Sequence, residues 1–275
     1  MRFVRWFAVG IVVLVAASFL ATPGYAGFEG YWLQTTISES EMSMTGKSSE
    51  KTKQKVFYKP GMIKIVDLGE DEITIVRMDK ELVWDIRVED STYTEMTFAQ
   101  MEKMSEEGKK QMAAARVEME QQMKDMSPEE RAMVEKMMGS QMSKMLGGGD
   151  ETGELILERT GKKEKISGHD CQQVVVTIDD DPFVEMWVTD EYELGGELFT
   201  IYEKMNLFKY KPSEDMNTFK SFPMKTIFTI NMGMGTMRNV TTVSEVVKTS
   251  LKDSEFELPK GLRLEKDENM MIRPE

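Results

Sequence analysis

The sequence predicts a mainly β chain of the α+β class, built on an antiparallel sheet, and three observations support this. Short apolar runs alternate with polar residues at a period of two over most of the chain. The gaps between these runs are short and rich in Gly, Pro and Asp, which favours hairpins over crossover connections. Residues 97–149 break the alternation and carry apolar residues at helical spacing instead.

The N-terminus has the order of a secretory signal peptide of 26 residues. Arg2 and Arg5 precede an apolar run over residues 7–20, and small residues then prepare a cleavage site after Ala26. The run is short for a bilayer span, which needs about 20 residues, so an uncleaved anchor is the weaker alternative. We therefore expect an exported, periplasmic protein with one mature domain over residues 27–275.

Charge and cysteine content exclude several classes of function. The chain has a formal net charge of −13, and removing Arg2 and Arg5 makes it two units more negative. Nucleic-acid binding depends on basic clusters, so we expect no nucleic-acid partner. The same charge disfavours tight docking on anionic lipid, so any membrane contact is expected to be transient. Cys171 is the only cysteine, which leaves no internal disulfide despite the oxidising compartment.

The β part of the chain falls into three series. Strand-like runs of the first series cover residues 55–58, 62–66, 73–77 and 82–86. A second series spans residues 154–189, with breaks at Gly161, Gly168 and 179–182; a third covers residues 224–230 and 237–247. Between the last two series, residues 197–210 have helical spacing, which predicts a helix.

The segment 97–149 predicts a methionine-rich helical hairpin. Twelve of the 26 methionines lie between Met96 and Met145, most of them at steps of three, four or seven residues. The sequence Ser127-Pro128-Glu129-Glu130 is typical of a helix start, with Ser as N-cap and Glu130 completing a capping box. The second helix is expected to end at three glycines, residues 147–149.

The methionine stripe leaves three interpretations open. It can be ordinary core, because methionine is a good helix former that fills gaps. It can be an adaptable apolar surface for a lipid, an acyl chain or a protein client. It can also capture Cu(I) through thioethers, since Met101/Met104 and Met142/Met145 stand one helical turn apart. For the second interpretation, the expected contact residues are Met119, Met123, Met126, Met133, Met137, Met142, Trp84 and Trp187.

No catalytic group is expected. His169 and Cys171 lie two residues apart and would share one face of a strand, but a metal or nucleophilic site needs further ligands or an orienting group. A glycine-led turn followed by a small buried thiol is the favoured interpretation. With a single histidine and no phosphate-binding loop or nucleophile elbow, we predict a protein that is not an enzyme, with no cofactor and no metal site.

A family resemblance rests on motifs of the second half. These are Thr160-Gly161, Ile166-Ser167-Gly168-His169-Asp170-Cys171, Val174-Val175-Val176 and Glu185-Met186-Trp187-Val188-Thr189. The arrangement resembles a family of uncharacterised bacterial exported domains, catalogued as a domain of unknown function. The ending at residues 253–261 resembles that of the wider lipoprotein-carrier group (LolA/LolB-like), which contains periplasmic lipoprotein chaperones and outer-membrane lipoprotein receptors. The resemblance implies a curved antiparallel half-barrel with helices over its concave face, and no catalytic residues.

Two functional hypotheses follow. The first is a periplasmic binding or carrier protein that holds an apolar ligand or a lipoprotein in a half-barrel groove under the methionine-rich helices. The second is an envelope scaffold or stress protein that binds another protein and holds no small ligand. Both predict a non-enzymatic partner-binding surface, and they differ in whether a lipid is bound.

Overall fold

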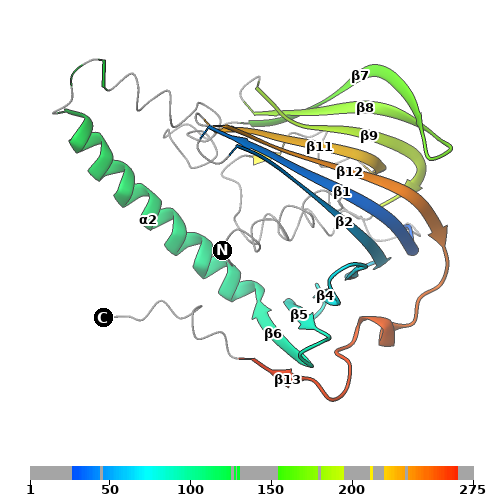
Figure 1. Cartoon of the computed structure of the whole chain (residues 1–275). Coiled ribbons are helices and arrows are strands. Elements are labelled where there is room, and N and C mark those ends of the chain that lie inside the picture. The colour runs from blue at the N-terminus through cyan, green and yellow to red at the C-terminus, as the bar shows by residue number, and fades with distance from the viewer. Residues whose placement is uncertain are drawn as a thin grey trace.

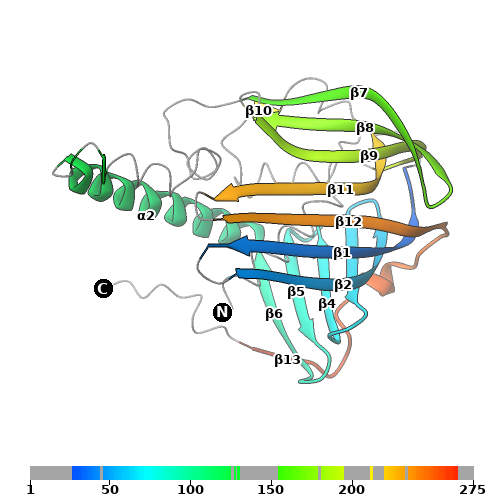
Figure 2. The ribbon, with the colours of Figure 1, turned by 45° about the horizontal axis from the view of Figure 1, so that its top comes forward.

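The structure is a computed structural model that describes residues 27–43, 46–124, 127, 129–130, 154–178, 181–194, 211–212, 220–232 and 235–265. Most of these residues belong to one large sheet (Figures 1 and 2). Its strands are β1 (Gly30–Met42), β2 (Gly46–Lys59), β3 (Met62–Asp67), β4 (Glu72–Arg77), β5 (Leu82–Arg87), β6 (Thr92–Thr97), β7 (Glu154–Ile166), β8 (His169–Ile178), β9 (Asp181–Glu193), β10 (Lys211–Pro212), β11 (Ser221–Met232), β12 (Gly235–Lys248) and β13 (Arg263–Leu264). Every strand-like run expected from the sequence lies inside one of them.

The sheet follows the chain in two antiparallel series of neighbouring strands. Its order is β10-β7-β8-β9-β11-β12-β1-β2-β3-β4-β5-β6-β13. The two series meet where β12 pairs with β1, from Gly30 opposite Lys248 to Met42 opposite Gly235. The expected antiparallel sheet is confirmed, and within the described residues only its two edges carry short parallel pairings. There β10 and β13, of two residues each, return from distant parts of the chain and pair in parallel with β7 and β6.

The first two strands of the second series, β7 and β8, are joined by a tight turn. Ser167 and Gly168 both have positive φ, 49° and 90°, which suits the two central residues of a tight hairpin between β7 and β8. The expected break at Gly161 is wrong, because β7 continues through it. The pairing of β7 with β8 skips between Arg159 and Lys163, so Gly161, at φ 77°, lies in an irregularity of the strand rather than in a turn.

Two apolar clusters lie on opposite faces of the sheet. The first cluster includes Trp32, Val56 and Tyr58, and we call the face that carries it the inner face. The second cluster consists of Ile75, Trp84, Ile86 and Phe256, and it lies on the outer face. Alternation along β4 shows the relation directly, because Val76 belongs to the first cluster and its neighbour Ile75 to the second.

The C-terminal segment closes the outer face over the short strands β3 to β6. The 3-10 helix η1 (Asp253–Phe256) places Phe256 at 0% exposure against Ile75 and Trp84. Arg77 supports it: this side chain, 5% exposed, is paired with Asp79 at 2.6 Å and donates a hydrogen bond to the Phe256 carbonyl oxygen at 3.3 Å. The C-terminal motif of the resemblance therefore has a packing role here.

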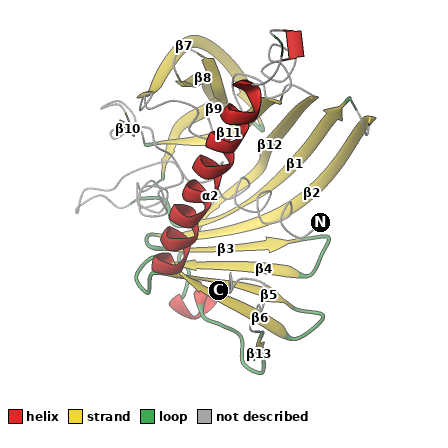
Figure 3. Ribbon diagram, turned by 90° about the vertical axis from the view of Figure 1, so that its left-hand side faces the viewer, coloured by secondary structure: helices red, strands yellow, loops and turns green. Residues whose placement is uncertain are grey.

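The helix α2 (Phe98–Lys124) crosses the inner side of the sheet (Figure 3), as the family resemblance implied for the helices. It confirms the first helix of the predicted hairpin. Residues 129–130 are helical, whereas the rest of the predicted second helix and the helix expected over 197–210 lie outside the described residues. The hairpin as a whole therefore stays a prediction. Of the helices in the described ranges, none combines the length and apolar character that a membrane crossing requires.

Candidate functional site

The predicted binding surface begins where α2 leaves the sheet. Thr97 and Gln100 form a capping box, in which the Thr97 N–H donates to Gln100 Oε1 at 2.8 Å and the Gln100 N–H donates to Thr97 Oγ1 at 3.2 Å. This cap fixes the first turn of the helix directly after β6. Phe98 is therefore buried, 5% exposed, and Met101 packs against the first cluster one turn later.

Beyond this turn the described apolar side chains of α2 are exposed. Met104 is 39% exposed and Val117 is 55% exposed. At 1.5 Å per residue a helix of 27 residues is about 40 Å long, so its main part extends well past the single turn that packs. Figure 1 shows α2 projecting away from β6 toward its far end. The helix is held at its beginning, and the large apolar side chains that the structure describes beyond its first turn are exposed.

The second helix starts as the sequence predicted. The Ser127 hydroxyl donates to Glu130 Oε2 at 2.8 Å, the Ser127 N–H donates to the same oxygen at 2.9 Å, and the Glu130 N–H donates to Ser127 Oγ at 3.3 Å. These bonds lower the pKa of the Glu130 carboxyl. The predicted contact residues of the hairpin cannot be placed in the same way. The side chains of Met119 and Met123 are not described, and Met126, Met133, Met137 and Met142 lie outside the described residues.

The two tryptophans of the predicted surface do not come together. Trp84 is 6% exposed in the second cluster, on the outer face, and its indole N–H donates to Glu95 Oε2 at 2.8 Å. Trp187 is half-buried on β9 and packs against the first cluster. Met101 and Met104, one of the two candidate Cu(I) pairs, lie in different environments: Met101 packs on the core and Met104 is exposed.

A polar band follows the apolar cluster on the inner face. Gln34, Thr36 and Thr241 are all less than 5% exposed on adjacent strands. They are satisfied locally: Gln34 accepts a hydrogen bond from Trp32 Nε1 at 2.8 Å, and the hydroxyls of Thr36 and Thr241 are 2.9 Å apart. A cavity between this band and Phe222 has about 10 Å³ of space for water. That volume holds about one water molecule and no acyl chain.

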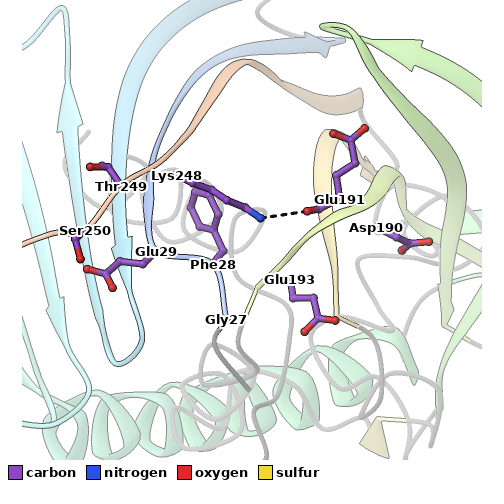
Figure 4. A pocket seen from close by; sticks show the side chains of 9 residues that line it. All are labelled: Gly27, Phe28, Glu29, Asp190, Glu191, Glu193, Lys248, Thr249 and Ser250. Carbon is purple, nitrogen blue, oxygen red and sulfur yellow. Dashed lines mark hydrogen bonds between the residues drawn. The ribbon is translucent and has the colours of Figure 1, made fainter. Parts of the chain in front are cut away.

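A larger cleft opens at the end of β9, where three distant segments meet (Figure 4). It has a volume of about 630 Å³ and is lined by Gly27, Phe28, Glu29, Asp190, Glu191, Glu193, Lys248, Thr249 and Ser250. Four carboxylates and one ammonium make this cleft polar and acidic. No local pattern marked it in the sequence, because residues 27–29, 190–193 and 248–250 share no motif and are joined only by the pairing of strands.

His169 contacts Glu191 of this cleft, and Cys171 is buried two residues further along β8. His169 Nδ1 lies 2.8 Å from Glu191 Oε2, and the imidazole packs edge-on against the Tyr192 ring. Cys171 is 3% exposed, and desolvation raises the pKa of its thiol to about 11. The expected turn and buried thiol are confirmed. Within the described ranges, His, Cys, Asp and Glu side chains form no group of three or more suited to a metal ion.

Comparison with known proteins gives the family. Residues 75–262 match the family described as Domain of unknown function (DUF4412), and the chain belongs to it. The matched range runs from β4 to the residue before β13, and so includes α2, the second strand series and η1. No curated protein sequence matches the chain significantly.

Solved structures show broad, weak similarity. An uncharacterized conserved protein from Thermus thermophilus has 9% identity and a TM-score of 0.40, with 85% of this chain and 89% of that chain covered. A LolA superfamily protein from Nitrosomonas europaea has 8% identity and a TM-score of 0.31, with 90% and 97% covered. A chain of the Pseudomonas aeruginosa MucA/MucB complex has 8% identity and a TM-score of 0.31, with 85% and 57% covered. Similarity of this size transfers no ligand and no partner.

Proposed function

We propose that this protein is an exported, non-enzymatic binding protein that holds an apolar client, either a lipid, an acyl chain or a lipoprotein. The client would contact the methionine-rich hairpin predicted for residues 97–149, of which α2 crosses the inner side of the sheet. The observation that carries this proposal is the exposure of α2. The first turn of this long helix packs on the core, and among the side chains described beyond that turn Met104 and Val117 are exposed.

Methionine suits such a surface for a physical reason. Its unbranched thioether side chain adopts many shapes at low cost and is polarizable, so a methionine surface fits clients of different outline. A core of the same size would be better specified by leucine and isoleucine, which have defined rotamers. The methionine composition of the stripe, together with the exposure of Met104 and Val117, therefore favours a client surface over the core interpretation. The proposed contacts are Met119, Met123, Met126, Met133, Met137 and Met142.

Tryptophans contribute little to this contact surface. Trp84 lies beneath Phe256 on the outer face and would support the sheet rather than touch the client. Trp187 packs against the first cluster from β9 and is accessible only in part. The closed packing around the one-water cavity also favours a client on the helix side of the inner cluster, and not between Trp32 and Phe222.

Titration with a dansylated fatty acid tests the proposal. Wild-type protein should bind the probe saturably, and unlabelled oleate should displace it. The triple change Met133→Gln, Met137→Gln and Met142→Gln keeps helix propensity but makes the surface polar, so we expect at least tenfold weaker binding with an unchanged melting temperature. The matched control, leucine at the same three positions, should retain affinity.

Other results would decide against the proposal. A large loss of stability in the glutamine variant would identify the stripe as core, because buried amides would lack partners. Loss of Cu(I) affinity without any change in probe binding would identify a metal site. Absence of both probe and Cu(I) binding in the wild type would leave the scaffold hypothesis, in which the client is another protein.

A further inference from the structure

Five lysines gather on the outer face of the sheet, four of them on the long strands β2 and β11 and one on β3. Lys51, Lys53 and Lys55 occupy alternate positions of β2 and therefore point to one side of the sheet. Lys64 of β3 stands opposite Phe57 on the same face. Lys225 of β11 lies in the same cross-strand row as Lys53, connected through Thr35 of β1 and Thr242 of β12. We call these five lysines the outer lysine face.

The charges of the outer lysine face are not neutralised by ion pairs within the described part of the chain. Among the described residues, none of the five ammonium groups has a carboxylate oxygen within 4.0 Å. Two neighbouring cations on the same strands behave differently. Lys47 is paired with Glu41 at 3.2 Å, and Arg238 is paired with Glu39 at 3.4 Å. These two carboxylates are thus engaged near the strand tips, away from the row of lysines on β2.

Apolar side chains are interleaved with these lysines. Lys55 Nζ lies 3.9 Å from the centre of the Tyr31 ring and 4.9 Å from that of Phe57. Lys51 stands opposite Ile37, which is 37% exposed. Lysine stems that lie along rings and aliphatic groups, with their ammonium heads in water, are typical of surfaces at a membrane–water interface.

The distribution of charge sets this face apart from the rest of the chain. The whole chain carries a net charge of −13, so a region with five lysines outside any ion pair creates a strong charge asymmetry across the molecule. Glu158, Glu185 and Glu245 also face the outer side, and the five lysines outnumber them; Glu39 and Glu41, on the same face, are paired with Arg238 and Lys47. Such an asymmetry orients a protein in solution, turning the positive face toward an anionic surface while the remainder is repelled. Neither the one-water cavity nor the acidic cleft is lined by one of these lysines, so the face offers a broad surface rather than a site for a small ligand.

We infer that the outer lysine face is a docking surface for a membrane that carries anionic phospholipid headgroups. Charge complementarity and the interleaved aromatic side chains favour a lipid surface over a folded acidic partner, which would require a shaped site. Docking here leaves the inner face and α2 free, so the inference does not depend on client binding by the methionine-rich hairpin.

Co-sedimentation with vesicles tests the inference. Protein without its first 26 residues should partition onto vesicles of 30% phosphatidylglycerol in phosphatidylcholine at least tenfold better than onto phosphatidylcholine alone. A lysine near an anionic surface contributes about a fivefold gain in partition, so Lys51→Glu, Lys53→Glu and Lys55→Glu together should reduce binding by roughly 100-fold or more. Binding should also fall steeply between 50 mM and 500 mM NaCl.

A matched control separates local charge from net charge. Lys162, Lys163 and Lys165 of β7 are exposed, and their reversal to glutamate changes the net charge by the same amount. This control variant should lose far less binding than the outer-face variant. Equal losses in the two variants, or equal wild-type binding to both kinds of vesicle, would overturn the inference. Wild-type binding to polyglutamate but not to anionic vesicles would also overturn it.

Folding of the variants is checked independently. Circular dichroism and melting temperatures should match the wild type closely, since five of the six lysines are exposed and Lys55 is only half-buried. If reversal of the outer lysines unfolds the protein, the neutral variant Lys51→Gln, Lys53→Gln, Lys55→Gln replaces it. That variant should still lose at least tenfold in partition, and full retention of binding would reject the membrane surface.

Discussion

The two ends of the sheet are built by different rules. The short strands β3 to β6, of six residues each, are covered on both faces, by the first turn of α2 on the inner side and by the C-terminal segment on the outer side. The long strands β1, β2, β11 and β12, of 12 to 14 residues, bury one face only. The difference is visible in the side chains. Strands that are covered on both faces carry near-continuous apolar runs. In β2, which buries one face, lysines occupy alternate positions and point to the solvated face.

The two ends of the sheet therefore differ in how tightly their packing is constrained. Burial on two faces gives the short-strand end the more tightly constrained packing, and changes there should be costly. The outer face of the long-strand end is solvated, so substitutions there should change binding rather than stability. Substitutions at both ends test this difference between the constrained short-strand end and the solvated long-strand end.

Truncation of Phe256 should have the largest effect. Phe256→Ala removes a side chain of 0% exposure between Ile75 and Trp84, and the loss should be about 3–5 kcal/mol of unfolding free energy. Urea denaturation followed by tryptophan fluorescence measures it. Leu264→Ala, in the same segment but 48% exposed, is the control and should change stability by less than about 0.5 kcal/mol. Equal effects of the two changes would show that the C-terminal segment does not seal the sheet.

Replacement of Arg77 should come second. Arg77→Met removes a buried cation that joins Asp79, Glu257 and the Phe256 carbonyl oxygen. Breaking a fully buried pair costs about 3–5 kcal/mol, and we expect about 2 kcal/mol because both carboxylates are half exposed and can be rehydrated. The same denaturation experiment measures the loss. A change below about 0.5 kcal/mol would mean that the C-terminal segment is held by Phe256 alone.

The Arg77 ion pairs also predict a pH dependence. Hydrogen bonds from Arg77 lower the pKa of the Asp79 carboxyl, and those from Lys80 and Arg77 lower that of Glu257. A depressed pKa in the folded state contributes stability above the unfolded value, at about pH 4 to 4.5, and this contribution is lost as the pH falls further. Unfolding free energy should therefore decline below about pH 4.5, and the decline should be shallower in Arg77→Met. If the wild type and Arg77→Met lose unfolding free energy with the same pH dependence, the Arg77 ion pairs are not its origin.

Paired changes in α2 come third and test where the helix is attached. Met101→Gln should cost about 1–2 kcal/mol, because Met101 packs against the inner cluster. Met104→Gln, three residues further and 39% exposed, should change stability by less than about 0.5 kcal/mol. Thermal unfolding measures the stability of both variants, and because each replaces methionine by glutamine, a change in helix propensity does not distinguish them. A large cost at both positions would mean that more of α2 packs as core, and it would weaken the proposed client surface.

The smallest effect is expected on the outer face of the long strands. Ile37→Ser on β1 should change unfolding free energy by less than about 0.5 kcal/mol, because Ile37 is 37% exposed. If Ile37 meets the membrane interface, the same variant should bind anionic vesicles more weakly than the wild type. Strong destabilisation without any change in vesicle binding would show that this face is covered in solution.

Local patterns predicted much of this fold. The period of two placed each strand-like run within a strand, and Gly168 marked the turn between β7 and β8, because glycine adopts positive φ without steric cost. The capping box at Ser127 and Glu130 marked a helix start, because its hydrogen bonds join residues three apart. Long-range features were not predictable in the same way. The acidic cleft, the second cluster under Phe256 and the separation of Trp84 from Trp187 all depend on contacts between segments far apart in the chain.

The sequence by itself determined the strands, the turns, the helix starts and the acidic composition, because propensity, period and charge are properties of neighbouring residues. Only the tertiary structure decided which lysines share a face, since Lys225 meets the row of Lys53 through two intervening strands. It also decided that Met101 packs while Met104 is exposed, although both have the same side chain one turn apart. The physical reason is that burial and charge density depend on what the opposite strand or helix contributes, and pairing across the sheet sets that contribution.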